Sequence, residues 1–168
     1  MMREWSDLFE AIDNPLPISW QSQTPTYWSG HFMAGEEEYF VSADCGSEGF
    51  PDPDDPGRDA PWFDLGFGIT RNGLSGDRVI GSQGWQFRIF ATAIAGFREF
   101  IHAEKPPLIM LSASKDNPNR LPLYQRLARR LTPEIAQLGY RSCPAPENRY
   151  VATHKYFDTM AWRRDAVE

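Results

Sequence analysis

The segment from Gly76 to Tyr140 constrains the fold of this chain more than any other feature. It contains, in order, a glycine-rich turn, an amphipathic pattern, a short apolar run and a second amphipathic pattern that ends in Leu-Gly-Tyr. Amphipathic patterns with apolar residues three or four positions apart predict helices that pack on a sheet. A continuous apolar run predicts a strand that is covered on both faces. The segment therefore predicts an α/β half-domain built as turn, helix, strand and helix.

The first helix of this segment is predicted to begin at an N-cap, Ser82, and to continue to about Ala103. Pro106-Pro107 ends the connection, and the apolar run Leu108–Leu111 predicts the buried strand. A further strand, Trp62–Thr70, precedes the helix and has alternating apolar residues. Strand, helix and strand in this order favour parallel or mixed pairing through a right-handed crossover.

The second helix is predicted to begin at Asn119, whose side chain can cap it. Thr132-Pro133 resembles a fresh N-cap followed by proline at the first helical position, so we expect the helix to break there and restart. The restarted part continues to Leu138, and Gly139 ends it. One last β-like segment follows at Arg149–Trp162.

The N-terminal half is predicted to be mostly β-structure. Residues 3–12 carry one apolar face and predict a short helix, after which Trp20–Asp44 has the composition of strands, with a hairpin turn at Gly35. Asn72-Gly73 is the strongest short hairpin signal in the chain. Leu74–Ile80 is then either a return strand or a loop that leads to the helix, and we favour a short hairpin.

An acidic loop is predicted between the two β-rich parts. Cys45–Pro61 contains enough proline and glycine to prevent a regular element. It also contains four aspartates, Asp52, Asp54, Asp55 and Asp59. Oxygen ligands of this kind suit hard cations, but the spacing is not that of an EF-hand loop. A solvated acidic loop is the preferred interpretation, a cation site is the alternative, and we predict no metal centre.

The chain has the size and composition of one folded domain. Its 168 residues are 41% hydrophobic, which excludes a disordered chain and suffices for a core. We divide the domain, residues 1–168, into a helix and β-rich half (1–75), a turn-helix-strand-helix half (76–140) and a C-terminal strand segment (141–168).

The net charge and the two cysteines make some classes of function less expected than others. A net charge of −6 argues against binding of duplex nucleic acid and would suit a protein partner with a basic face. Cys45 and Cys143 match no metal spacing, and free thiols are preferred over a disulfide. No apolar run is long enough to cross a membrane, so we expect a cytoplasmic protein.

Two stretches resemble motifs of the GNAT N-acetyltransferases. The run from Arg78 to Gly84, at the start of a helix, resembles the loop with which that family binds the pyrophosphate of acyl-CoA, although Gly84 lies one position later than the family pattern. Leu123-Tyr124 resembles the second motif, whose tyrosine often serves as general acid, and Gly139-Tyr140 falls where family members commonly have Gly-Phe or Gly-Tyr. The resemblance implies a GNAT-like α/β (α+β) fold, with a mixed, largely antiparallel sheet and two main helices packed on it.

The same resemblance implies acetyl-CoA as cofactor and assigns roles to individual residues. Asp64, on the strand before the loop, is the candidate general base that takes a proton from an amine, and Tyr124 is the candidate acid that protonates the leaving thiolate. The candidate cofactor-binding residues are Arg78, Gly81, Ser82, Gln83, Gly84, Asn119 and Arg120.

Each of these residues also has a purely structural interpretation. Asp64 can be an outward residue of an alternating strand, and Tyr124 lies on the apolar face of its helix, where a core tyrosine is expected. The glycines from Gly81 to Gly84 can form a turn and a cap without binding an anion.

The histidines and the arginine-rich helix indicate no further site. His31, His102 and His154 have no zinc-like spacing, so surface or structural roles are expected. We interpret the arginines of the second helix as a solvated face, and a patch that binds phosphate or a partner is the alternative. These arginines are Arg120, Arg126, Arg129 and Arg130.

About a third of the chain is also similar to uncharacterised proteins of tailed phages. The matching residues are Arg88, Phe90-Ala91-Thr92, Phe100-Ile101, Pro106, Leu111-Ser112-Ala113, Arg120, Leu123-Tyr124 and Gly139-Tyr140. This similarity implies the host-cell cytoplasm or the virion as the location.

Two functions follow from the sequence. The first is transfer of an acyl group from acyl-CoA to an amine of a small molecule or protein. The alternative is a non-catalytic GNAT-like phage-type protein that serves as a virion component or binds a host protein. The sequence leaves open the acceptor, the partner and the oligomeric state.

Overall fold

A computed structural model of the chain describes residues 14–46, 48–71, 74–75, 86–116 and 120–165. The helices are α2 (Gln86–Glu104), α3 (Arg120–Ala136) and a short 3₁₀ helix, η1 (Thr153–Lys155). The strands are β1 (Ser19–Thr24), β2 (Tyr27–Ala34), β3 (Glu37–Gly46), β4 (Trp62–Arg71), β5 (Leu74–Ser75), β6 (Leu108–Ser114), β7 (Tyr140–Cys143) and β8 (Phe157–Arg164). The helix predicted over residues 3–12 and the caps predicted at Ser82 and Asn119 lie outside the described residues.

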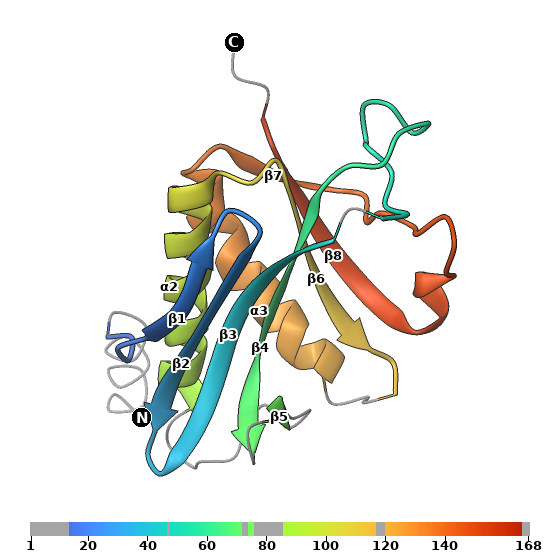
Figure 1. Ribbon diagram of the computed structural model, residues 1–168. Helices are drawn as coiled ribbons and strands as arrows, with labels where there is room; N and C mark the ends of the chain where they lie inside the picture. The colour runs from blue at the N-terminus through green and yellow to red at the C-terminus, as the bar shows by residue number, and fades with distance from the viewer. Residues whose placement is uncertain (1–13, 47, 72–73, 76–85, 117–119, 166–168) are drawn as a thin grey trace.

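The described strands form one mixed sheet. Its order is β1-β2-β3-β4-β6-β8-β7, with β5 paired to β4 outside this path. Every pairing is antiparallel except that of β4 with β6. Helices α2 and α3 lie side by side against one face of the sheet (Figure 1). The prediction of a mixed α/β fold, with a largely antiparallel sheet and two helices packed on it, is therefore confirmed.

The N-terminal half is the predicted set of hairpins. β2 and β3 are joined by a tight turn in which Gly35 has φ of 65°, a conformation that favours glycine. β5 returns against β4, since Thr70 pairs with Ser75. The predicted return strand is confirmed for Leu74–Ser75, while Asn72-Gly73 and the rest of the segment to Ile80 lie outside the described residues.

Helix α2 is the predicted crossover between two parallel strands. Its apolar face is fully buried in the main core at Ile89, Ala93, Phe97 and Ile101. At Gly96 the helix lies so close to the sheet that an added Cβ would be 3.2 Å from Val41 Cγ2. Burial of this face explains why an amphipathic pattern alone was sufficient to predict the element.

Helix α3 continues through Pro133, so the predicted break at Thr132-Pro133 is wrong. The Thr132 hydroxyl donates a hydrogen bond to the carbonyl of Ala128 at 2.6 Å and accepts one from the indole of Trp162 at 3.1 Å. Buried residues on both sides of the proline, Leu131 and Ile135, hold the two halves against the core. These tertiary contacts offset the hydrogen bond that proline removes.

The C-terminal part departs furthest from the sequence prediction. The predicted segment Arg149–Trp162 contains η1 and only the first part of β8, and β7 was not predicted. β8 lies between β6 and β7, so the last strand of the chain is not at the edge of the sheet. β7 has only four residues, of which two are exposed, too short for a periodic pattern. Gly139, with φ of 92°, ends the preceding helix region as predicted.

The acidic loop between β3 and β4 is held by arginines of the C-terminal segment. Asp59 accepts a hydrogen bond from Arg149 Nε at 2.7 Å, and Asp54 pairs with Arg163 at 2.7 Å. Within the described ranges, no three His, Cys, Asp or Glu side chains are grouped so that they could hold a metal ion. Two of the four loop aspartates thus form ion pairs within the chain.

Two further sequence expectations concern the thiols and the membrane. Cys45 and Cys143 are both free, as preferred from the sequence. Among the described residues, no helix is long and apolar enough to cross a membrane.

Thr132→Val is expected to destabilise the fold by about 1–3 kcal/mol, because the buried indole N–H of Trp162 would lose its acceptor. Denaturant unfolding of the purified protein measures this loss. In a Trp162→Phe background, the same substitution should cost clearly less, since no indole N–H remains to be satisfied. An equal loss in the two backgrounds would contradict the assigned contact.

Candidate functional site

The candidate site lies where β4 and β6 separate. These parallel strands share only two residue pairs, Phe63 with Ile109 and Asp64 with Met110. Beyond them, the two backbones diverge toward the carboxyl ends of the strands (Figure 1). In open sheets, ligands bind preferentially at the carboxyl ends of neighbouring parallel strands. The divergence is therefore the candidate ligand-binding site.

Each diverging strand follows its own antiparallel neighbour. β4 stays paired with β3 up to Thr70, and β6 stays paired with β8 along its whole length, from Leu108 to Ser114. The sheet thus consists of two antiparallel groups of strands joined by the short β4–β6 contact. Past Asp64 and Met110, the facing edges of β4 and β6 are free of ladder pairing in the described chain as far as Thr70, where β5 pairs with this edge of β4.

Aromatic side chains fill the helix side of the divergence. Phe67 is fully buried there, and its ring centroid lies 5.9 Å from that of Phe90 and 5.6 Å from that of Tyr124. Tyr124 comes from the first half of α3 and is only 3% exposed. Its position agrees with the core tyrosine that its helix face predicts, and also brings it next to the divergence.

The opposite face of the sheet carries a pair of carboxylates. Asp64 points away from the helices, as expected for an outward residue of an alternating strand, and lies directly opposite Asp44 in the register of β3 and β4. Surrounding protein disfavours the charged form of Asp64, and the charge of Asp44 adds to this effect. Together they raise the pKa of Asp64 to about 7, although its side chain still reaches solvent. Such a carboxylate can exchange a proton near neutral pH.

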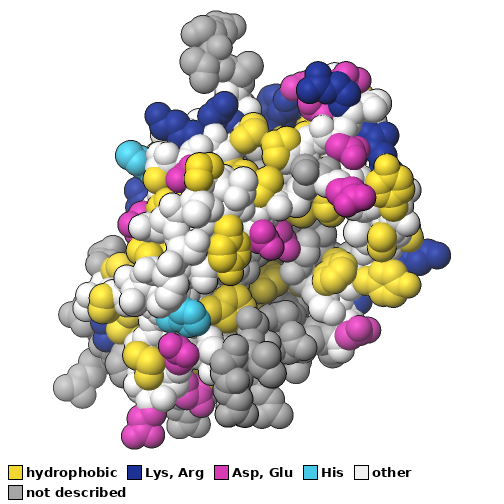
Figure 2. Space-filling view, viewed as in Figure 1, with side chains coloured by type: hydrophobic (Ala, Val, Ile, Leu, Met, Phe, Trp, Pro, Cys, Tyr) yellow, Lys and Arg dark blue, Asp and Glu magenta, His cyan; other side chains and the backbone are white. Residues whose placement is uncertain are grey.

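Hydroxyl groups extend this polar surface onto the other group of strands. Ser112 of β6 and Thr159 of β8 lie within 3.0 Å of each other through their side-chain oxygens. Both lie on the same face as Asp64, because Ser112 follows Met110 by two positions. The open face, viewed in Figure 2, carries acidic side chains among neutral and hydrophobic ones. A cationic or amine-bearing molecule would meet a favourable potential there.

The structure brings only some of the predicted site residues together. Asp64 and Tyr124 flank the same divergence from opposite faces of the sheet. Arg78, Gly81, Ser82, Gln83, Gly84 and Asn119 lie outside the described residues. Arg120 is the first residue of α3, and its side chain is not described.

Asp44 is the functional candidate that sequence reasoning missed. It is the last residue of the predicted β-rich stretch Trp20–Asp44, but its effect on Asp64 depends on a pairing across the long acidic loop. Only the alternation of both strands, combined with an antiparallel register, could have placed the two carboxylates opposite each other.

The histidines have the surface roles expected of them. His31 lies 3.6 Å from Glu38, and His154 lies 2.8 Å from Glu147. His102 is exposed in the last turn of α2.

Asp64→Asn is expected to change the pH dependence of stability. The pKa of Asp64 rises from 3.8 to about 7 on folding, so the native state holds this proton more tightly than the unfolded state. The contribution of Asp64 to stability is therefore present at low pH and is lost as pH rises through about 7. The variant should match the parent near pH 4.5 and exceed it near pH 8, by about 1 kcal/mol or less because solvent screens an exposed carboxylate. Urea unfolding at both pH values measures the difference, and an equal difference at both would contradict the raised pKa.

Comparison with known proteins gives no family to which this site could be assigned. No protein-family model matches the chain, no curated protein is significantly similar to it, and no solved structure matches its fold.

Proposed function

We propose that this protein is an acyl-CoA-dependent N-acyltransferase whose cofactor lies at the divergence of β4 and β6. The observation that carries the proposal is the parallel pairing that ends after Asp64 and Met110. It leaves two facing strand edges that can receive an extended chain bearing amide groups. The pantetheine arm of acyl-CoA is such a chain, with a thioester at its end.

The residues beside the divergence suit the chemistry of amide formation. The amine nitrogen attacks the thioester carbonyl, loses a proton, and the carbon–sulfur bond breaks to release the thiol of CoA. Asp64, with a pKa of about 7, is the candidate base for the amine proton. Tyr124, on the other side of the divergence, is the candidate acid for the leaving thiolate, a role that the GNAT resemblance gives it.

The cofactor phosphates are assigned by resemblance alone. Backbone N–H groups at a helix N-terminus attract phosphate, and Arg78 with the loop from Gly81 to Gly84 precedes α2 directly in the chain. Asn119 and Arg120 are the proposed contacts from the start of α3. Acetyl-CoA is the proposed cofactor, and the acceptor is an amine of a small molecule or protein.

A second candidate function is a non-catalytic GNAT-like module of the phage type, acting as a virion component or binding a host protein. The observation that favours it is a set of exposed hydrophobic side chains in the segment before and at the start of β8. They are Tyr150 (73% exposed), Val151 (51%), Tyr156 (56%) and Phe157 (41%). Exposed tyrosines and phenylalanines are enriched in protein interfaces. An acyltransferase with a protein acceptor could use the same surface.

Acetyl-CoA should bind the purified protein with micromolar affinity, and Gly81→Glu should weaken binding at least about tenfold by placing a carboxylate where a phosphate is expected. Gly57→Glu is the matched control, because it adds the same charge in the exposed acidic loop. It should change the affinity by less than about twofold. Calorimetric titration measures all three proteins.

Absence of binding at millimolar acetyl-CoA would rule out the enzyme and leave the partner-binding module. An equal loss in both glycine variants would assign any binding to overall charge rather than to the proposed loop.

A further inference from the structure

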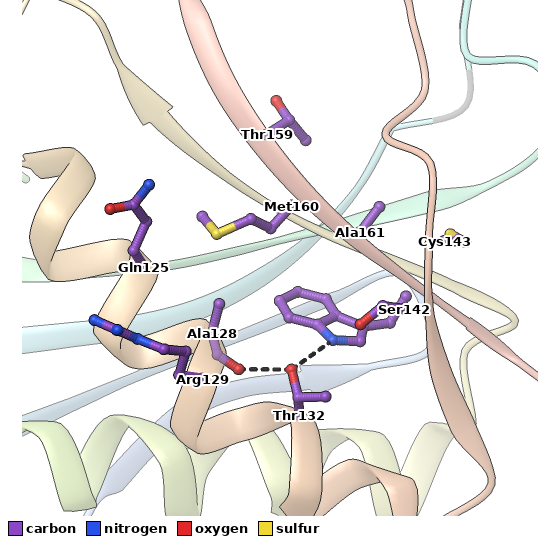
Figure 3. A pocket seen from close by; sticks show the side chains of 10 residues that line it. Gln125, Ala128, Arg129, Thr132, Ser142, Cys143, Thr159, Met160 and Ala161 are labelled. Carbon is purple, nitrogen blue, oxygen red and sulfur yellow. Dashed lines mark hydrogen bonds between the residues drawn. The ribbon is translucent and has the colours of Figure 1, made fainter.

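A separate cavity of about 600 Å³ opens between α3 and the β7–β8 edge of the sheet. It lies on the far side of β6 from the divergence, since β8 and β7 follow β6 in the sheet order. Figure 3 shows side chains from α3, β7 and β8 around it. Its volume is in the range of sites that hold one small molecule.

The floor of this cavity is apolar and fixed. Trp162 is 2% exposed, and its indole N–H is tied to Thr132, whose hydroxyl is itself tied to the carbonyl of Ala128. Met160 extends beside it from β8 toward α3 (Figure 3). A flat hydrophobic group placed here would lie against Met160, next to a buried indole that already has its preferred hydrogen bond and need not move.

The charge of the cavity comes from one residue. Among the described residues that line it, Arg129 is the only charged side chain, and none is a carboxylate. Several arginines of the chain are ion-paired, as in the pairs Arg98–Glu134, Arg141–Asp165 and Arg163–Asp54. Within the described residues, Arg129 forms no such pair. The chain as a whole has a net charge of −6. This cavity nevertheless favours an anion, because an unpaired guanidinium and no described carboxylate line it.

One neutral polar side chain lies next to this guanidinium. Gln125 precedes Arg129 by one helical turn, and Figure 3 shows the two side chains extending from α3 on the same side of the cavity. Ser142 adds a hydroxyl from β7 on the opposite side of the cavity (Figure 3). A carboxylate at Arg129 would therefore have a charged donor and a neutral amide donor within one helix face.

We propose that this cavity binds a small monoanion with a flat apolar body, an aromatic carboxylate in chemical class. The carboxylate would lie against Arg129 and Gln125, and the ring would lie against Met160, beside the buried indole of Trp162. The proposal does not depend on acyl transfer, because the cavity shares only Thr159 with the polar surface described beside the β4–β6 divergence.

A second cavity nearby, about 490 Å³ in volume, differs from the first in the charge of its lining. It is lined by Arg141 and Arg163, but also by Asp52 and Glu147. Carboxylates in its wall disfavour an anionic ligand there. The two cavities share Ser142 and Cys143 of β7, so substitutions of these residues would not separate them.

The test uses indole-3-acetate as probe, with indole-3-acetamide as its neutral counterpart. Ligand-observed NMR titration measures the affinity of each probe for the full chain and for two variants. Arg129→Gln removes the charge inside the cavity, and Arg130→Gln removes the same charge from an exposed neighbour on the same helix that does not line it.

The acetate should bind at least about tenfold more tightly than the acetamide. Arg129→Gln should abolish this preference, and Arg130→Gln should change it by less than about twofold. Equal affinity for the two probes, an equal loss in both variants, or no binding of the acetate at about 10 mM would each overturn the proposal. Arg129 is exposed and, within the described residues, unpaired, so its replacement should leave the thermal unfolding midpoint unchanged. A change in binding can then be attributed to the removed charge.

Discussion

The short parallel contact between β4 and β6 is the constraint on which the rest of the structure depends. Two residue pairs join a group of five strands to a group of three. Helix α2 lies between β4 and β6 in the chain, and its burial along one face fits a crossover connection that brings β6 back parallel to β4. Both helices then cover the same face, and Asp64 is left on the open one.

Helix α3 links the two proposed sites. Tyr124 points from it toward Phe67 at the divergence, whereas Gln125 and Arg129 line the cavity beside β8. Adjacent residues of a helix point about 100° apart, so one helix can serve both places. The hydrogen bond between Trp162 and Thr132 holds α3 against β8 and keeps this double placement fixed despite Pro133. Stability of α3 and geometry of both sites are therefore coupled.

Local patterns were sufficient to predict the elements whose burial is regular. The alternation of Trp62–Thr70, the apolar face of α2 and the glycine at 139 all predicted what the structure contains. Pairings between distant segments were not predictable. The insertion of β8 between β6 and β7, the continuity of α3 and the juxtaposition of Asp44 with Asp64 each depend on contacts that leave no periodic signal in the sequence. Asp64 could be predicted as the candidate base because the alternation of its strand is visible in the sequence. The burial and the neighbouring charge of Asp44, which raise its pKa, could not be predicted.

Amide hydrogen exchange with and without acetyl-CoA tests the central claim most directly, because it reports where along the backbone a ligand lies. If the cofactor occupies the divergence, protection should rise in Leu65–Thr70 of β4 and in Leu111–Ser114 of β6, while the distant β1–β2 hairpin should exchange as before. Unchanged exchange in both strand segments at saturating acetyl-CoA, or protection confined to the β7–β8 edge, would contradict a cofactor site between β4 and β6.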